Sequence, residues 1–127
     1  MTVVALKQRY DGHAKRAALV AAAHSYMARL IAVVDEDIDP SNLNDVMWAI
    51  ATRCEPSEQI DILRNAWSSA LDPRIPADAK LAGITAHSKA IIEACRPFSW
   101  KEKFPPTSAL SMEEARAIEH KWGDKLK

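Results

Sequence analysis

The chain has 127 residues, enough for one domain with a substantial core but too few for two. Its 48% hydrophobic and 27% charged content is typical of an ordinary soluble globular protein. Seventeen basic residues balance seventeen acidic ones and no basic block stands out, so we expect no nucleic-acid partner. The apolar stretch 17–23 is far shorter than the roughly 20 residues that span a bilayer, so we expect no membrane segment.

The cysteines and glycines exclude several kinds of site. Cys54 and Cys95 are far apart and lack CxxC spacing, and no signal peptide precedes them, so we expect a cytoplasmic protein whose cysteines are reduced, buried and not nucleophilic. The only glycines are Gly12, Gly83 and Gly123, which form neither a GxGxxG motif nor a P-loop. We therefore expect no cofactor-binding residue in this chain.

The first half of the chain alternates between strand and helix patterns. A strand is expected at residues 2–6, followed by an alanine-rich helix at 13–27 that can lie close against a sheet. Residues 30–34 form a short apolar run rich in β-branched residues, which is typical of a strand buried on both faces. Ser41 or Asn42 then caps a helix at 43–53.

A third strand is expected at residues 59–63, and this order of elements indicates right-handed crossovers and a parallel sheet. Residues 65–86 contain Pro73, Pro76 and Gly83 and are expected to form an irregular loop. Residues 90–94 favour a fourth strand over a helical turn. Prolines then exclude regular structure through most of 97–106, and a capping box at Ser111 begins a last helix that runs to about residue 125. The expected fold class is α/β, a small three-layer sandwich with a mainly parallel sheet and a C-terminal helical arm.

Several longer motifs occur in a fixed order. They are ALKQRYDGHAK at 5–15, VVDEDIDPSNLNDVMWAIATRCEP at 33–56, LDP at 71–73, SKAIIEA at 88–94, and RPF at 96–98 with KFP at 103–105. Together they resemble the C-terminal domain of the UbiD family, the prenylated-flavin enzymes that add or remove carboxylate on aromatic and α,β-unsaturated acids. The family usually has proline where Asp11 stands. The resemblance covers about residues 3–106, so we expect a UbiD-like domain over 1–106 and a separate C-terminal helix within 107–127.

The resemblance also implies what this chain lacks. In the UbiD family the catalytic arginine and glutamates, and the residues that hold the flavin phosphate and its divalent metal ion, lie upstream of the matched part. The resemblance therefore implies a small subunit or separated domain of a decarboxylase or carboxylase, not catalytic alone. Such a domain would complete an oligomer and cover the active site of a larger catalytic partner that holds prenylated FMN. The alternatives are a non-catalytic interaction module that lost its enzyme, or a receiver-like signalling domain. The receiver would need an aspartate just after the third strand, where Leu63, Arg64 and Asn65 stand.

Ligands of open parallel sheets bind at the carboxyl ends of the strands. On that rule the loops at 7–13, 35–39 and 65–72 share one edge of the sheet. The acidic cluster Asp35, Glu36 and Asp37 would either bind a divalent cation or serve in capping, loop hydrogen bonds and solvated charge. Adjacent residues point in different directions and rarely form a complete metal site alone, so we expect no metal-binding residue.

Three residues are candidates for a substrate pocket: His13, Trp67 and Leu71. His13 begins a helix, where it would either exchange protons or serve only the turn. In UbiD-like enzymes the loop that corresponds to Trp67 and Leu71 lies over the aromatic end of the substrate, whereas the alternative is that Trp67 packs on the sheet. His24, His87 and His120 are expected to be ordinary surface or partly buried residues.

The last helix carries an apolar stripe of Ala115, Ile118 and Trp122, with Met112 beside it. The stripe either packs on a neighbouring subunit in a homo- or hetero-oligomer or caps the chain's own core.

Overall fold

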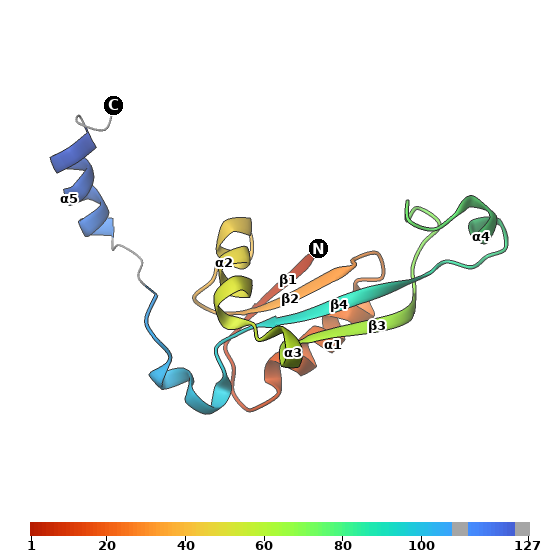
Figure 1. Ribbon diagram of the computed structural model, residues 1–127, viewed down its shortest axis with the longest axis horizontal. Helices are drawn as coiled ribbons and strands as arrows, with labels where there is room; N and C mark the ends of the chain where they lie inside the picture. The colour runs from red at the N-terminus through yellow and green to blue at the C-terminus, as the bar shows by residue number, and fades with distance from the viewer. Residues whose placement is uncertain (108–111, 124–127) are drawn as a thin grey trace.

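The computed structural model describes residues 1–107 and 112–123 (Figure 1). Its centre is a four-stranded sheet with the order β1-β2-β4-β3. The strands β1, β2 and β4 are parallel to one another, and β3 pairs antiparallel with β4 at the edge. The strands are β1 (Thr2–Leu6), β2 (Leu30–Asp35), β3 (Ile60–Trp67) and β4 (Ala86–Ala94).

Two helices cover opposite faces of this sheet, which gives the expected three layers. They are α1 (His13–His24) and α2 (Leu43–Arg53). Residues of β2 alternate between the two faces and are fully buried on both, as the apolar run predicted. On the α1 side these are Ile31 and Val33, and on the α2 side Ala32 and Val34.

The alanines of α1 face the sheet, and Ala14, Ala18 and Ala22 are buried in the core. The helix ends at His24, three residues before the predicted end. The buried ammonium of Lys89 donates to the carbonyl oxygens of Ala22 at 3.0 Å and Ser25 at 2.6 Å, so it caps the last turn. Burial lowers the pKa of Lys89.

The helix α2 has the predicted bounds, and Asn42 caps it by accepting a hydrogen bond from Asn44 N at 3.0 Å. At its other end Arg53 forms an ion pair with Asp35, the last residue of β2, at 3.0 Å. The helix therefore ends beside the carboxyl end of β2. The next strand must start there, so β3 runs antiparallel, and the prediction that β3 joins the sheet by a parallel crossover is wrong.

The strand β3 is also longer than predicted, and the short helix α3 (Pro56–Gln59) precedes it. The register with β4 shifts between Leu63 and Ala66, where Asn65 has a φ of 57°. The strand continues through this bulge, because asparagine tolerates the left-handed conformation. Pairing then continues to Trp67.

The stretch predicted as an irregular loop contains the end of β3, the short helix α4 (Ala77–Leu81) and the start of β4. The strand expected at 90–94 is confirmed as β4, which begins four residues earlier. The proline-rich stretch contains a 3-10 helix, η1 (Phe98–Lys103), kinked at Trp100, which corrects the expectation of mostly irregular chain. The last helix is α5 (Met112–Trp122), which lies apart from the sheet in Figure 1; the predicted ends at residues 111 and 125 fall outside the described residues.

Candidate functional site

The sheet has two edges where loops meet, and they differ in character. We call the ends of β1, β2 and β4 the carboxyl edge and their starts the amino edge. Because β3 is antiparallel, residues 65–72 lie at the amino edge. The prediction that the loops at 7–13, 35–39 and 65–72 share one edge is therefore wrong. His13 lies at the carboxyl edge, and the structure does not bring it together with Trp67 and Leu71.

At the carboxyl edge, hydrogen bonds and ion pairs form a network around the buried carboxylate of Asp35. Its Oδ1 accepts from Gln8 Nε2 at 2.9 Å, and its Oδ2 accepts from Arg53 Nη1 at 3.0 Å and from Arg96 N at 2.7 Å and Nε at 3.1 Å. Arg53 also makes a bidentate pair with Asp37 at 2.8 and 2.7 Å. The Arg53 guanidinium lowers the pKa of Asp37.

The same network engages two of the three residues of the acidic cluster. Asp35 and Asp37 bind guanidinium groups in this structure, and Glu36 is exposed. Within residues 1–107 and 112–123, no group of three histidine, cysteine or acidic side chains could hold a metal ion. In this structure the two aspartates form hydrogen bonds and ion pairs with Arg53 and Arg96. These contacts connect the end of β2 to α2 and to the segment that follows β4.

His13 lies in a packed turn at the carboxyl edge. Its ring stacks on Tyr10 with centroids 4.4 Å apart, and its Nδ1 accepts from Arg9 N at 3.3 Å. Nearby, Lys15 pairs with Asp61 and, at 2.6 Å, with Glu93. Hydrogen bonds to Asp61 and then Glu93 raise the pKa of Lys15. The ion pairs of Lys15 connect the start of α1 to β3 and β4. The contacts of His13 with Tyr10 and Arg9 stabilise the turn before α1.

The amino edge exposes several large apolar side chains. Trp67 is 67% exposed and Leu71 78% exposed. The Trp67 ring lies against Tyr26, with centroids 5.1 Å apart, so it rests on the loop between α1 and β2. Further large apolar side chains of this edge and of the segment between β3 and β4 are also exposed: Met1, Met27, Leu81 and Ile84. An apolar surface of this kind is typical of a contact with another protein segment or a ligand.

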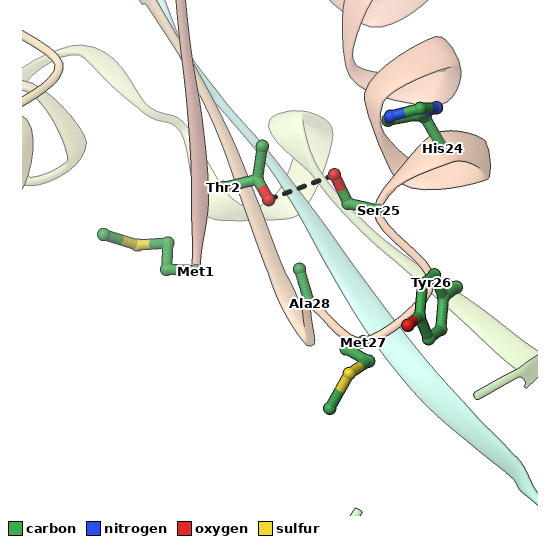
Figure 2. Close-up of a pocket in the computed structure, with 7 residues that line it drawn as sticks. All are labelled: Met1, Thr2, His24, Ser25, Tyr26, Met27 and Ala28. Atoms are coloured by element: carbon green, nitrogen blue, oxygen red, sulfur yellow. Dashed lines mark hydrogen bonds between the residues drawn. The ribbon is translucent and has the colours of Figure 1, made fainter. Parts of the chain in front are cut away.

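Beside Tyr26 the amino edge is hollowed by about 490 Å³ (Figure 2). The hydroxyl of Thr2 donates to Ser25 Oγ at 3.1 Å and ties the start of β1 to the end of α1. The side chains that line the hollow belong to the start of β1 and the loop after α1: Met1, Thr2, His24, Ser25, Tyr26, Met27 and Ala28.

A polar cluster that the sequence did not reveal lies beneath this apolar surface. Asp72 is buried, and its Oδ2 lies 2.6 Å from Arg29 Nη2 and 2.9 Å from His87 Nδ1. Its Oδ1 accepts from Arg74 N at 2.9 Å. Hydrogen bonding to Arg29, and then to Arg74 N and His87, holds the pKa of Asp72 well below its usual range. His87 is buried and paired with Asp72, which corrects the expectation of an ordinary surface or partly buried histidine. Spacing alone could not reveal the cluster, because its members come from three separate segments.

Both cysteines are free thiols, Cys95 buried and Cys54 partly buried. Burial raises the pKa of each thiol, that of Cys95 very strongly. Cys95 packs in the core against α1, as a small hydrophobic residue would.

These features fit one family of domains. Residues 1–94 match the family model of the 3-octaprenyl-4-hydroxybenzoate carboxy-lyase C-terminal domain, and the chain belongs to this UbiD C-terminal domain family. The match includes both edges of the sheet and all four strands. No helix in the described part of the chain is long and apolar enough to cross a membrane.

Similar proteins are several times longer. The phenolic acid decarboxylase of Sedimentibacter hydroxybenzoicus is 32% identical over 98% of this chain, which spans 25% of that protein. A phenolic acid decarboxylase of Streptomyces sp. (strain D7) is 37% identical over 76% of the chain and 20% of its own length. The chain thus spans about a quarter or less of these curated relatives.

Solved structures show the same correspondence. The UbiD-class enzyme HmfF from Pelotomaculum thermopropionicum, in complex with FMN, superposes with a TM-score of 0.73 at 27% identity, over 87% of this chain and 24% of HmfF. The closed form of vanillic acid decarboxylase from Sedimentibacter hydroxybenzoicus superposes with a TM-score of 0.69 at 31% identity, over 98% of this chain and 26% of that one.

Proposed function

We propose that this chain is the C-terminal domain or small subunit of a UbiD-class decarboxylase or carboxylase of aromatic or α,β-unsaturated acids. Its task is to complete the oligomer and to cover the active site of a larger catalytic region. The family match and the decarboxylase names of the relatives support the reaction class. The single observation that carries the covering role is the exposed apolar amino edge around Trp67 and Leu71.

The family resemblance implies prenylated FMN with a divalent metal ion as the cofactor of this enzyme, and the similar UbiD-class enzyme HmfF is in complex with FMN. The residues described here do not fit that group. Gly12 and Gly83 stand alone in turns, and no cluster of metal-ligating side chains occurs within residues 1–107 and 112–123. The carboxylates of Asp35 and Asp37 are already paired with guanidinium groups. We therefore assign the cofactor and the chemical step to the catalytic region.

The amino edge suits the covering role for two reasons. Several of its large exposed side chains are apolar, and water is excluded from a site when such side chains close over it. The loops of the opposite, carboxyl edge are held together by the buried ion pairs of Asp35. The apolar contact surface is thus at the amino edge. A domain built in this way presents Trp67 and Leu71 to the apolar end of a substrate, with polar contacts on its other side. His13, on the carboxyl edge, is a weaker candidate for the same pocket.

The test has two parts. A tagged form of the chain, expressed with its neighbouring genes, should co-purify with a larger chain that carries flavin absorbance and that mass spectrometry identifies as UbiD-like. The complex should release carbon dioxide from an aromatic or α,β-unsaturated acid. The isolated chain, mixed with reconstituted prenylated FMN, should retain no flavin after gel filtration and should release no carbon dioxide. Flavin retained by the isolated chain, or a purified chain that never pairs with a flavin-binding protein, would contradict the proposal.

A further inference from the structure

We propose that Arg29 and His87 are positioning residues that act through Asp72 to hold Trp67 and Leu71 in a single arrangement at the amino edge. This inference rests on the proposed function, because it assigns a task to the residues beneath the substrate-facing surface. It concerns the turn of residues 68–75, which follows β3 and precedes α4.

The turn is fixed by one buried carboxylate that joins three segments. Asp72 lies in the turn, Arg29 lies just before β2, and His87 lies near the start of β4. The Oδ2 of Asp72 is shared by Arg29 Nη2 at 2.6 Å and His87 Nδ1 at 2.9 Å. Because an ionised carboxylate can only accept, His87 must donate from Nδ1. Hydrogen bonds to charged groups are the stronger kind, so these two contacts fasten the turn to the sheet.

Local hydrogen bonds then fix the backbone next to the exposed side chains of Trp67 and Leu71. Ser69 Oγ accepts from Leu71 N at 3.0 Å, and the carbonyl of Ser69 accepts from Asp72 N at 3.0 Å. Ser68 N donates to Thr85 O at 2.9 Å, which closes the segment directly after Trp67. Leu71 directly precedes Asp72, so its backbone is held within the anchored turn.

The second exposed side chain is held through the same loop that carries Arg29. Trp67 lies against Tyr26, and Lys89 holds the carbonyl oxygen of Ser25 beside it at 2.6 Å. Arg29 follows Tyr26 in the loop between α1 and β2, and its ion pair with Asp72 connects this loop to the turn that contains Leu71. A surface that is ordered before it meets a substrate loses less side-chain and loop entropy on binding, so it binds more tightly.

The first arm of the test measures order in the full chain without any activity. Amide hydrogen exchange of residues 68–75 should become faster in Arg29→Met and His87→Leu, while exchange of β2 stays as in the wild type. His87→Asn should restore slow exchange, because its amide NH₂ can replace Nδ1–H as a donor to Asp72. Arg74→Met is the matched control, since it removes an exposed arginine of the same turn whose guanidinium makes no ion pair with Asp72. Unchanged exchange in both Arg29→Met and His87→Leu would overturn the proposal.

The second arm uses the enzyme assembled from this chain and its catalytic region. Arg29→Met and His87→Leu should raise KM about threefold with kcat nearly unchanged, because the contact that is loosened binds substrate and transition state alike. His87→Asn and Arg74→Met should keep the KM of the wild type. An active enzyme whose KM does not respond, despite faster exchange in the turn, would reduce the cluster to a structural role and overturn the proposal. An assembled enzyme that decarboxylates no acid would contradict the proposed function instead, and the exchange arm alone would then decide whether the cluster positions the turn.

Discussion

The indole of Trp67 lies against the phenol ring of Tyr26, with centroids 5.1 Å apart and planes inclined by 37°. The pair joins the end of β3 to the loop after α1 and leaves 67% of Trp67 exposed. The Trp67 ring thus contacts a neighbouring loop, and most of its surface is exposed.

We expect Trp67→Ala or Leu71→Ala to change the kinetics of the assembled enzyme while its assembly stays intact. Each substitution removes apolar surface from the proposed pocket wall, so KM should rise by about tenfold, equivalent to about 1.4 kcal/mol. Gel filtration of the complex and steady-state kinetics with several acids measure the two effects. Met47→Ala, on the exposed side of α2, is the control. Equal kinetics for all three variants would leave Trp67 and Leu71 without a role in the pocket.

The buried ion pair between Arg53 and Asp35 should dominate the stability of the carboxyl edge. Arg53→Leu leaves a buried carboxylate without its α2 partner, and breaking such a pair costs about 3 kcal/mol of unfolding free energy. Urea unfolding followed by circular dichroism measures this loss. Arg64→Leu removes an exposed arginine and should change stability by less than about 0.5 kcal/mol. Similar losses in the two variants would contradict the importance of the buried pair.

Asp37 and Asp72 should make the domain sensitive to acid. Their pKa values are lowered in the folded state, by Arg53 and Arg29 respectively, so the unfolded chain binds protons first as the pH falls. Their contribution to stability is therefore present above the unfolded pKa of about 3.9 and is lost as the pH falls through the folded values. Arg29→Met should flatten the fall in unfolding free energy below about pH 4, whereas Arg74→Met should keep it. An equally steep fall in both variants would show that Arg29 does not set the pKa of Asp72.

The helix α5 should mediate contacts between chains. Ile118 is 45% exposed and Trp122 44% exposed, on a helix that lies apart from the sheet in Figure 1. Static light scattering should therefore give a larger mass, in multiples of the chain, for the full chain than for a chain ending at residue 109. Monomers in both cases at high protein concentration would favour the alternative that the stripe caps the chain's own core.

The sequence predicted the elements whose patterns are local. The apolar run of β2 and the cap at Asn42 specify their elements within a few residues, and both have nearly the predicted bounds. The direction of β3 could not be predicted in this way, because parallel and antiparallel strands share the same period of two. It follows from the place where α2 ends, beside the carboxyl end of β2, where Arg53 meets Asp35, a residue 18 positions earlier.

The candidate site was only partly predictable for a related reason. Trp67 and Leu71 were selected from the family resemblance, but their edge of the sheet follows from the direction of β3. The role of His87 depends on Asp72, 15 residues before it, and the burial of Lys89 depends on carbonyl groups of α1 more than 60 residues away. Polar residues in a strand normally indicate a solvent-facing side, so β4 was predicted too short.

The position of β4 between β2 and β3 has a consequence for how the chain folds. β3 pairs only with β4 in this sheet, and β2 meets β4 across about 60 residues of sequence. Until residues 86–94 have left the ribosome, β3 lacks its partner in the described sheet, in which only β1 and β2 can already pair. Of the four described strands, β4 is synthesised last and joins β3 to β2, and such long-range pairing favours slow folding.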